Sequence, residues 1–280
     1  MNGASLAWRS CLLFVPGHRP DRFEKARKAS PEGVVLDLED AVPAGEKGAA
    51  RAAVIDYLAT RSDGSAVHVR INGASTRAGL DDLAALADGR LPADGLVLPK
   101  VESARDIEIV RQLDPRPARA LMAAVESAAG IDNARAIAAA LGEGDALVFG
   151  GAELAADLGA AFAWEPLLAA RCALVRAAAA ARLPAFDVPF LKIDAPEALA
   201  EEARRVRDLG FSGKLAIHPA QVGPIRAAFS PTPDEVDRAR RIVAAIEAAG
   251  GGVATVDGRM IDAPVAGSAR RALARVQARS

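Results

Sequence analysis

Short apolar runs alternate with helical patterns eight times over the first 230 residues of this 280-residue chain. The eight predicted strands are residues 10–17, 33–39, 66–72, 95–101, 119–126, 145–151, 185–193 and 214–218, and one crossover helix is expected over 130–141. This alternation predicts parallel strands joined by helical crossovers. Eight units in this length favour an α/β fold of the closed (β/α)8 TIM-barrel type over an open doubly wound sheet. No GxGxxG motif follows the first strand, which weakens the dinucleotide-binding alternative.

The last fifty residues follow a different pattern. An amphipathic helix with acidic residues in its first turn is predicted over 234–249, a small hairpin or loop over 253–262, and a basic helix over 266–278. Such a segment is too short for an ordinary independent domain. We therefore expect a barrel domain over 1–230. The C-terminal helical or hairpin extension over 231–280 is expected to pack on the barrel and on a neighbouring subunit.

Composition excludes several classes of protein. The chain is 51% hydrophobic and 25% charged with a net charge of -1, which excludes intrinsic disorder and bulk attraction to nucleic acid or anionic membranes. Cys11 and Cys172 fit no metal or redox spacing and suit a reducing cytoplasm. Residues 1–10 lack the features of a signal peptide, and no apolar run approaches the roughly 20 residues of a membrane span.

Charged and polar side chains gather where the predicted strands end. They are Asp37, Glu39 and Asp40 after the second strand, Arg70 and Asn72 after the third, Lys100 and Glu126 after the fourth and fifth, Glu153 beyond the sixth, and His218 after the eighth. The active site of an α/β barrel lies at these carboxyl ends. Strand alternation turns Arg70 inward as a cation at the mouth. It places His68 deeper, where we interpret it as a hydrogen-bonded core histidine.

Glu126 and Glu153 are the candidate ligands of a divalent cation. Each follows an apolar strand, and two carboxylates that converge at a barrel mouth suit Mg²⁺, which keeps several waters when bound to protein. Arg70 and Lys100, with backbone N–H groups near Gly151, suit an anionic substrate.

Asp37 and Glu39 have two interpretations that the sequence leaves open. They hold the neighbouring basic side chains in place, or they support metal-bound water. Both are therefore candidate catalytic groups.

Eight segments, in order over nearly the whole chain, resemble one known family. They are RSCLLFVPG at 9–17, VVLDLEDAV at 34–42, VRIN at 69–72, LPKVES at 98–103, AAVESAAGI at 123–131, FGGAELAADLG at 149–159, IHPAQ at 217–221 and DGRMIDAPV at 257–265. Together they resemble the citrate lyase beta-subunit-like branch of the HpcH/HpaI aldolase superfamily. The match is specific for the family and much less specific for the substrate.

The resemblance implies a (β/α)8 barrel that forms a homotrimer or a dimer of trimers. It also implies Mg²⁺, with Mn²⁺ as an alternative, and coenzyme A as part of the substrate. By this resemblance Glu126 is the first metal carboxylate and Arg70 holds the keto-acid oxygens. Asp262 resembles an acid/base residue that enters a neighbouring subunit's site. Arg19 and Lys25 are candidates for the coenzyme A phosphates, with solvated helix charges as the alternative.

One position departs from the family pattern. The second metal ligand of the family is typically Asp, in a pattern like FGxxDLxxDLG, and here that position is Glu153. The extra methylene displaces the carboxylate, and Mg²⁺ demands near-ideal octahedral geometry. Asp157, one turn further along, is interpreted as a structural helix residue.

The sequence therefore predicts a cytoplasmic, Mg²⁺-dependent carbon–carbon lyase. Its expected substrate is a 3-hydroxyacyl-CoA such as citramalyl-CoA, malyl-CoA or citryl-CoA, cleaved into an acyl-CoA and a 2-keto acid. Two alternatives stay open: a class II pyruvate aldolase acting on free hydroxy-keto acids, and a low-activity or acyl-carrier-dependent lyase subunit. The sequence names neither the acyl group nor the keto acid, and it leaves trimer and hexamer open.

Overall fold

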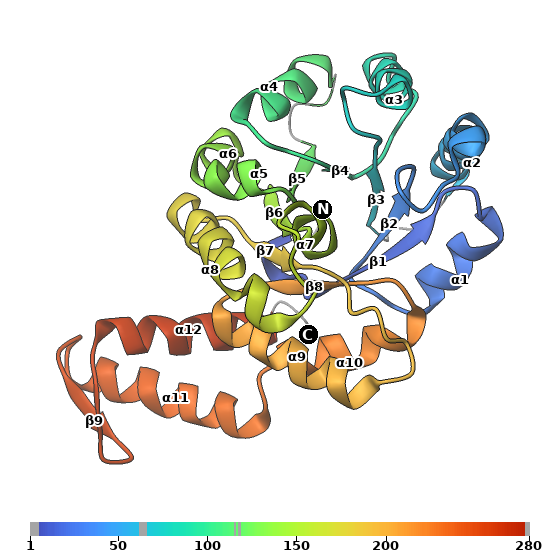
Figure 1. Ribbon diagram of the computed structural model, residues 1–280. Coiled ribbons are helices and arrows are strands. Elements are labelled where there is room, and N and C mark those ends of the chain that lie inside the picture. The colour runs from blue at the N-terminus through green and yellow to red at the C-terminus, as the bar shows by residue number, and fades with distance from the viewer. Residues whose placement is uncertain (1–5, 62–65, 115, 117–118, 278–280) are drawn as a thin grey trace. The chain divides into compact units, whose positions relative to one another are not determined.

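A closed barrel of parallel strands forms the larger part of the molecule (Figure 1). The computed structural model describes residues 6–61, 66–114, 116 and 119–277. Within them the barrel strands are β1 (Cys11–Pro16), β2 (Gly33–Asp37), β3 (Val67–Arg70), β4 (Gly95–Leu98), β5 (Ala120–Val125), β6 (Ala146–Phe149), β7 (Ala185–Asp187) and β8 (Gly213–Ala216). Leu12 of β1 pairs with Gly33 of β2 on one side and with Leu215 of β8 on the other, which closes the barrel. The predicted (β/α)8 fold is confirmed.

Helices surround the barrel and connect its strands (Figure 1). They are α1 (Phe23–Lys28), α2 (Lys47–Thr60), α3 (Arg77–Ala87), α4 (Ala104–Leu113), α5 (Ala128–Asp132), α6 (Ala134–Ala140), α7 (Gly151–Asp157), α8 (Trp164–Ala181), α9 (Pro196–Leu209) and α10 (Val222–Phe229). Short 3-10 turns occur at Leu6–Trp8, Pro20–Arg22, Ala44–Glu46 and Pro219–Gln221. Local capping fixes several helix starts: the Thr76 hydroxyl accepts a hydrogen bond from the Gly79 N–H at the start of α3, for example.

Several predicted strands end two or three residues earlier in the structure, and two predicted elements differ more. The strand predicted over 185–193 ends at Asp187, because Pro189 has no N–H to offer a neighbouring strand. The helix predicted over 130–141 is two helices, α5 and α6, which meet at Asn133.

The barrel interior is a packed apolar core. Its buried side chains include Leu12, Val35, Val97, Met122, Val148, Phe186 and Leu215, contributed by different strands. The strands turn alternate residues inward, so apolar residues fill the interior while the polar strand ends stay at the mouth.

His68 is buried in this core with 3% of its surface exposed. Neither ring nitrogen has a hydrogen-bond partner within the part of the chain that the structure describes, so the interpretation of a hydrogen-bonded histidine was wrong. Burial, and after it the charge of Arg9, lowers the pKa of His68 to about 3. The ring is therefore neutral and acts as a packing group.

The C-terminal residues form a second compact unit, Ala227–Ser280, while Met1–Arg226 form the first. The second unit contains α11 (Pro233–Ala248), the antiparallel hairpin of β9 (Ala254–Val256) and β10 (Arg259–Ile261), and α12 (Ala263–Gln277). Its small core consists of Ala239, Ile242, Ile246, Ile261, Ala266 and Ala269. The contacts divide the chain four residues before the predicted boundary, and residue 278 of the predicted last helix lies outside the described residues.

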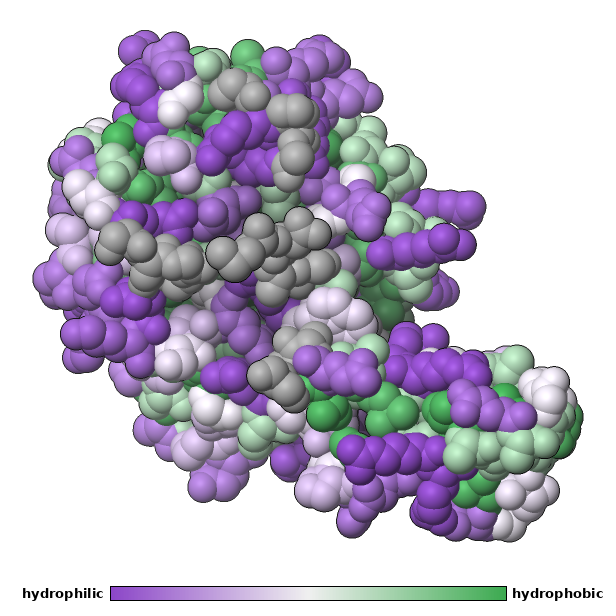
Figure 2. Space-filling model, turned by 180° about the vertical axis from the view of Figure 1, so that it is seen from behind, coloured by the Kyte–Doolittle hydropathy of each residue, from purple (hydrophilic) through white to green (hydrophobic). Residues whose placement is uncertain are grey.

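The surface of the second unit carries apolar side chains between charged ones (Figure 2). Val253, Met260 and Val265 are the large apolar residues exposed near its hairpin and the start of α12. Contact with another subunit through this unit stays a prediction.

None of the described helices is long and apolar enough to cross a lipid bilayer. Both cysteines, Cys11 and Cys172, are free thiols. The prediction that residues 1–10 lack the features of a signal peptide falls in part on residues 1–5, which lie outside the described part of the chain.

Candidate active site

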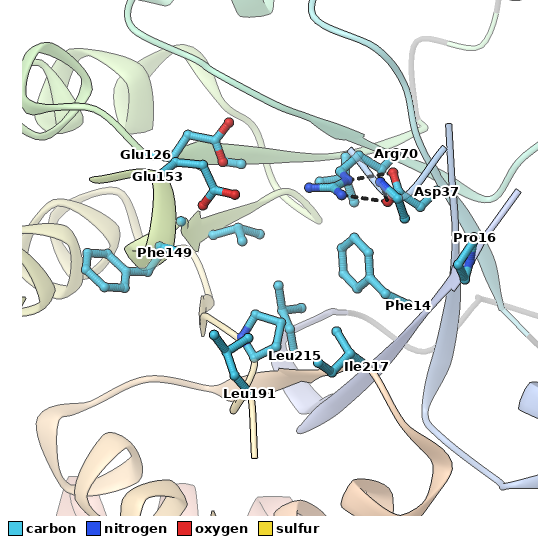
Figure 3. Close-up of a pocket in the computed structure, with 17 residues that line it drawn as sticks. Phe14, Pro16, Asp37, Arg70, Glu126, Phe149, Glu153, Leu191, Leu215 and Ile217 are labelled. Atoms are coloured by element: carbon cyan, nitrogen blue, oxygen red, sulfur yellow. Dashed lines mark hydrogen bonds and ion pairs between the residues drawn. The ribbon is translucent and has the colours of Figure 1, made fainter. Parts of the chain in front are cut away.

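A pocket of about 290 Å³ opens at the carboxyl ends of the barrel strands (Figure 3). Its lining residues are Phe14, Pro16, Asp37, Ala41, Arg70, Val97, Ala124, Glu126, Val148, Phe149, Gly150, Ala152, Glu153, Pro189, Leu191, Leu215 and Ile217. Figure 3 shows Glu126 and Glu153 together on one side of the pocket and the Arg70–Asp37 pair on the other side, with Phe14 and Leu215 below these charged residues in the view. The pocket therefore places charges of both signs around an apolar floor.

Arg70 is a cation in a fixed position. It ends β3 beside Asp37, which ends β2, and the two residues are partners in the strand register. Arg70 Nε lies 2.7 Å from Asp37 Oδ1 and Arg70 Nη2 lies 2.6 Å from Asp37 Oδ2, a bidentate pair. The guanidinium carbon also lies 5.2 Å from the centre of the Phe14 ring. Burial alone would lower the pKa of Arg70, but the Asp37 hydrogen bonds and the Glu39 charge raise it, so the group stays protonated.

Asp37 and Glu39 hold the basic side chains in place. Besides Arg70, Asp37 accepts hydrogen bonds from the backbone N–H groups of Glu39 and Ala41, at 2.8 and 3.2 Å. Glu39 Oε2 lies 3.1 Å from Arg70 Nη1 and its Oε1 lies 2.7 Å from Lys100 Nζ. Burial raises the pKa of Glu39, while the charges of Arg70 and Lys100 oppose that rise. The sequence left two interpretations open, and these contacts fit the one in which Asp37 and Glu39 hold the neighbouring basic side chains in place.

Lys100 lies beside the pocket and not in its lining. Its side chain is 55% exposed and pairs with Glu39 and, at 3.8 Å, with Asp40. It lines a neighbouring polar hollow of about 480 Å³ and is not among the residues that line the 290 Å³ pocket. Its backbone N–H, however, donates a 2.8 Å hydrogen bond to Glu126 Oε1.

Glu126 and Glu153 come together as predicted from their strand ends. Glu126 directly follows β5 with 6% of its surface exposed, and Glu153 lies in the first turn of α7. Burial, then the nearby charges of Glu153 and Glu39, raise the pKa of Glu126 to about 8. A Cβ atom on Gly150 would lie 2.2 Å from Glu126 Cβ and 2.6 Å from Glu126 Oε2. Glycine at 150 therefore makes room for this carboxylate.

The pair fits a hard divalent cation. The repulsion that raises the pKa of Glu126 is the kind that a cation between two carboxylates removes. Among the described residues, no group of three or more His, Cys, Asp or Glu side chains forms a metal cluster. Two carboxylates would leave the other coordination positions to water and substrate, which is how Mg²⁺ is commonly bound. Figure 3 shows the Glu153 carboxylate beside that of Glu126, so the extra methylene does not turn it out of the pocket.

Several predicted binding residues lie outside the pocket lining. Arg19 forms a bidentate pair with Asp21 at 2.9 and 2.8 Å, and Lys25 is exposed on α1. Gly151 is buried as the first residue of α7, while its neighbours on both sides line the pocket. Asp262 belongs to the second unit, where its Oδ1 accepts a 3.3 Å hydrogen bond from the Val265 N–H at the start of α12.

The apolar floor of the pocket was not predicted from the charged strand ends. Phe14 of β1 and Leu215 of β8 belong to the barrel lining, and Ile217 directly follows β8. The alternation of inward residues in these two strands is the sequence pattern that identifies such positions.

The model of the HpcH/HpaI aldolase/citrate lyase family matches residues 10–219 of this chain. The chain belongs to this family. A (3S)-malyl-CoA thioesterase of Cereibacter sphaeroides is 38% identical over 273 residues, which cover 95% of this chain and 94% of that protein. A citrate lyase subunit beta of Leuconostoc mesenteroides is 33% identical over 280 residues, 95% of this chain and 92% of that protein.

Solved structures of family members agree with the fold. The CitE protein of Mycobacterium tuberculosis, in complex with magnesium, acetoacetate and coenzyme A, matches with a TM-score of 0.84 and 34% identity, over 99% of this chain and all of that one. RipC from Yersinia pestis matches with a TM-score of 0.73 and 38% identity, over 82% of this chain and 99% of that one. The resemblance inferred from the eight sequence segments is thereby confirmed.

Proposed function

We propose that this family member is a Mg²⁺-dependent carbon–carbon lyase. It cleaves a 3-hydroxyacyl-CoA thioester into an acyl-CoA and a 2-keto acid, and forms it in the reverse direction. The observation that carries the proposal is the Glu126–Glu153 pair facing the fixed cation Arg70 across one pocket. The similar CitE protein, whose crystals contain magnesium, acetoacetate and coenzyme A, supports the same cofactor and substrate class here.

Glu126 and Glu153 would hold the cation, with Mg²⁺ as the expected ion and Mn²⁺ as an alternative. A divalent cation in this position supplies Lewis-acid stabilisation of negative charge on the substrate oxygens. The Lys100 N–H fixes one oxygen of Glu126, and the bare Gly150 leaves space for the other. The Glu126 carboxylate is thus presented to the pocket in one orientation.

Arg70 binds and stabilises the keto-acid end of the substrate. Its bidentate pair with Asp37 holds the guanidinium at the mouth of the pocket before substrate binds. No further ordering of this side chain is then needed on binding. The charge of Arg70 faces the negative charge that grows on the substrate hydroxyl oxygen as this oxygen loses its proton, before the carbon–carbon bond breaks. Its effect is therefore larger in the transition state than in the ground state. Phe14 and Leu215 at the pocket floor exclude water from this region.

Cleavage of the carbon–carbon bond leaves a thioester enolate that must be protonated. Of the acids in the described lining, Asp37 is held by Arg70 and the two glutamates belong to the cation site. We infer that Asp262 of a neighbouring subunit supplies this proton, and removes it in the reverse direction. This assignment includes a homotrimer or a dimer of trimers in which the second unit reaches another copy's pocket.

Arg19 and Lys25 are proposed to meet the phosphates of coenzyme A. Both lie between β1 and β2, at the start of the first crossover and in α1. The Arg19–Asp21 pair is exposed, and such a surface ion pair is weak enough to be exchanged for a phosphate contact. Because both thiols are free, we also propose that the protein works in the reducing cytoplasm.

The test is a cleavage assay with malyl-CoA and with citramalyl-CoA, in Mg²⁺ and in EDTA. The expected result is a 2-keto acid and acetyl-CoA in equal amounts, abolished by EDTA and by Glu126→Gln. No turnover of any CoA ester or acyl-carrier thioester with metal present would refute the lyase proposal. Turnover of the acyl-carrier thioester alone would instead identify an acyl-carrier-dependent subunit.

Thioester hydrolysis is a second candidate, because the similar protein from Cereibacter sphaeroides is a (3S)-malyl-CoA thioesterase. Release of free coenzyme A, detected as a thiol, with no keto acid would identify this activity. Activity only on free 4-hydroxy-2-keto acids would identify a class II pyruvate aldolase in place of both.

A further inference from the structure

Lys100 has an unusual backbone conformation. It follows Pro99 just beyond β4, and its φ angle is +55°. A residue with a Cβ atom rarely adopts this left-handed conformation, and it persists only where surrounding contacts determine it. Two such contacts are present at Lys100, one through the backbone and one through the side chain.

The backbone contact reaches the cation site. The Lys100 N–H donates to Glu126 Oε1 at 2.8 Å, and Glu126 Oε2 lies over Gly150. The next residue is also fixed, because the Val101 N–H donates to the Ala124 carbonyl of β5 at 3.0 Å. The conformation at Lys100 therefore determines where one oxygen of Glu126 lies.

The side-chain contact reaches the opposite wall of the pocket. Lys100 Nζ lies 2.7 Å from Glu39 Oε1, and Glu39 Oε2 lies 3.1 Å from Arg70 Nη1. Glu39 is buried with 4% of its surface exposed, so it needs both cations to stay charged. Without the ammonium group, Glu39 depends on Arg70 alone and competes with the substrate for that cation.

We propose that Lys100 is a positioning residue that orients Glu126 through its N–H and balances Glu39 through its ammonium group. It touches neither substrate nor cation. One residue thereby connects the two charged walls of the pocket. This assignment replaces the sequence prediction that Lys100 binds the substrate directly. The proposal depends on the proposed function only in that the cation is Mg²⁺ and the substrate is a CoA thioester.

The backbone role is tested with Lys100→Gly and Lys100→Ala in the full chain. Both variants lose the ammonium group and keep the N–H, but glycine adopts a positive φ without strain and alanine does not. We expect Lys100→Ala to weaken Mg²⁺ binding by about tenfold, as loss of a supporting contact does. Lys100→Gly is expected to bind Mg²⁺ roughly fivefold more tightly than Lys100→Ala. The measurement is calorimetric titration of EDTA-treated protein with Mg²⁺ alone.

A matched control is available at Ser30, which has the same φ of +55° but lies outside the pocket. Ser30→Gly and Ser30→Ala should differ in thermal stability and bind Mg²⁺ equally. Equal Mg²⁺ affinities of the two Lys100 variants would overturn the backbone role. So would a difference between the Ser30 variants as large as that at Lys100, because strain anywhere would then explain the effect.

The side-chain role is tested by a double-mutant cycle with Glu39→Gln. If the ammonium group acts through Glu39, the double variant Lys100→Ala/Glu39→Gln loses no more kcat/KM than Lys100→Ala alone. If Lys100 binds substrate directly, the two losses add, and the proposal is overturned. Should the wild-type protein turn over no CoA ester, the proposed function fails. The Mg²⁺ titrations still decide the backbone role in that case.

Discussion

Glu126 and Gly150 occupy one small volume at the mouth of the barrel. A Cβ at position 150 would overlap the Cβ and Oε2 atoms of Glu126, at 2.2 and 2.6 Å, and these atoms belong to the side chain whose carboxylate we assign to the cation. Glu126 is held in this position, because the Lys100 N–H donates a hydrogen bond to its other carboxylate oxygen. At the scale of single residues, the absence of a side chain is therefore as important to the site as the charges around it.

Gly150→Ala is expected to weaken Mg²⁺ binding by at least about tenfold, because the methyl group displaces Glu126 from its supported position. Calorimetric titration of the metal-free variant measures the effect. Gly223→Ala is the control, since a Cβ there meets nothing within 4 Å. Wild-type Mg²⁺ affinity in Gly150→Ala would contradict the close approach of these two residues.

His68 makes the stability of the fold dependent on acid. Its pKa is lowered to about 3 in the folded protein, below the ordinary value of 6.5, so between these values the unfolded chain binds the proton more readily. The free energy of unfolding is therefore largest above the pKa that His68 has in the unfolded chain. It falls as the pH drops from that value toward the pKa of His68 in the folded protein. From pH 7 to pH 5 we expect a loss of about 2 kcal/mol in the free energy of unfolding.

Urea unfolding of the wild type and of His68→Leu at both pH values tests this. The variant lacks the titrating group and should lose less free energy than the wild type, by that same amount. Parallel losses in the two proteins would show that other groups cause the acid sensitivity.

Sequence reasoning identified the charged residues of the site but not all their partners. Arg70 and Asp37 end adjacent strands in the same register, so their pairing follows from the barrel itself. The role of Lys100 depends on a positive φ angle, and one sequence gives no indication of that conformation at a lysine. Likewise, no sequence pattern shows that Glu126, which follows the neighbouring strand β5, leaves room only for glycine at position 150.

The strands and helices themselves were largely predictable, because hydrophobic periodicity and turn residues specify them locally. The errors occur where tertiary contacts decide. β7 stops at Asp187, two residues before Pro189, and the Asp187 carboxylate pairs with two cations, Arg171 Nε at 2.8 Å and Lys214 Nζ at 2.7 Å. Residues 188–191 then leave the sheet and line the pocket through Pro189 and Leu191. A period-two pattern does not contain that information.

Lys214 is the side chain that joins these elements. It is fully buried in β8, and its ammonium group contacts Asp187 of β7, Glu202 of α9 and the Val188 carbonyl, each at 2.7 Å. Lys214→Met leaves these acceptors without their cation, so we expect a loss of about 3 kcal/mol or more in unfolding free energy.

Chemical denaturation measures this loss, and hydrogen exchange locates it. Amides of residues 188–195 and of α9 should exchange faster in the Lys214→Met variant, because the segment beyond β7 is no longer tied down. Lys192→Met, an exposed substitution in the same segment, should change neither quantity. A loss below about 1 kcal/mol in Lys214→Met would show that the buried ion pairs contribute no net stability.

The whole molecule consists of two compact units, and the residues of the pocket all belong to the first. The proposed proton donor, Asp262, belongs to the second. If each site is completed by another copy of the chain, then two different inactive variants can restore each other's activity in one oligomer. Such complementation distinguishes a proton donor in a neighbouring subunit from one in the same chain.

Arg70→Ala and Asp262→Asn are each expected to be inactive as pure proteins. Co-expressed with different tags and purified through both, they should regain activity in about a third of the sites of a trimer, or about a quarter in a dimer of trimers. These are the sites that combine an intact Arg70 with an intact Asp262 from a neighbour. The malyl-CoA or citramalyl-CoA assay measures it. If Asp262 serves its own subunit, no site in the hybrid has both residues and the mixture stays inactive.

Closure of the barrel joins the first strand to the last, since Cys11–Leu13 of β1 pair with Lys214–Ala216 of β8. During translation about 200 residues separate the two, and at roughly 5–20 residues per second the ribosome needs about 10–40 seconds to deliver the partner. For that time the nascent chain carries β1 with an open hydrogen-bonding edge, the kind of edge on which chains aggregate. Successful synthesis of this protein therefore depends on protecting the open edge of its first strand until β8 has been made.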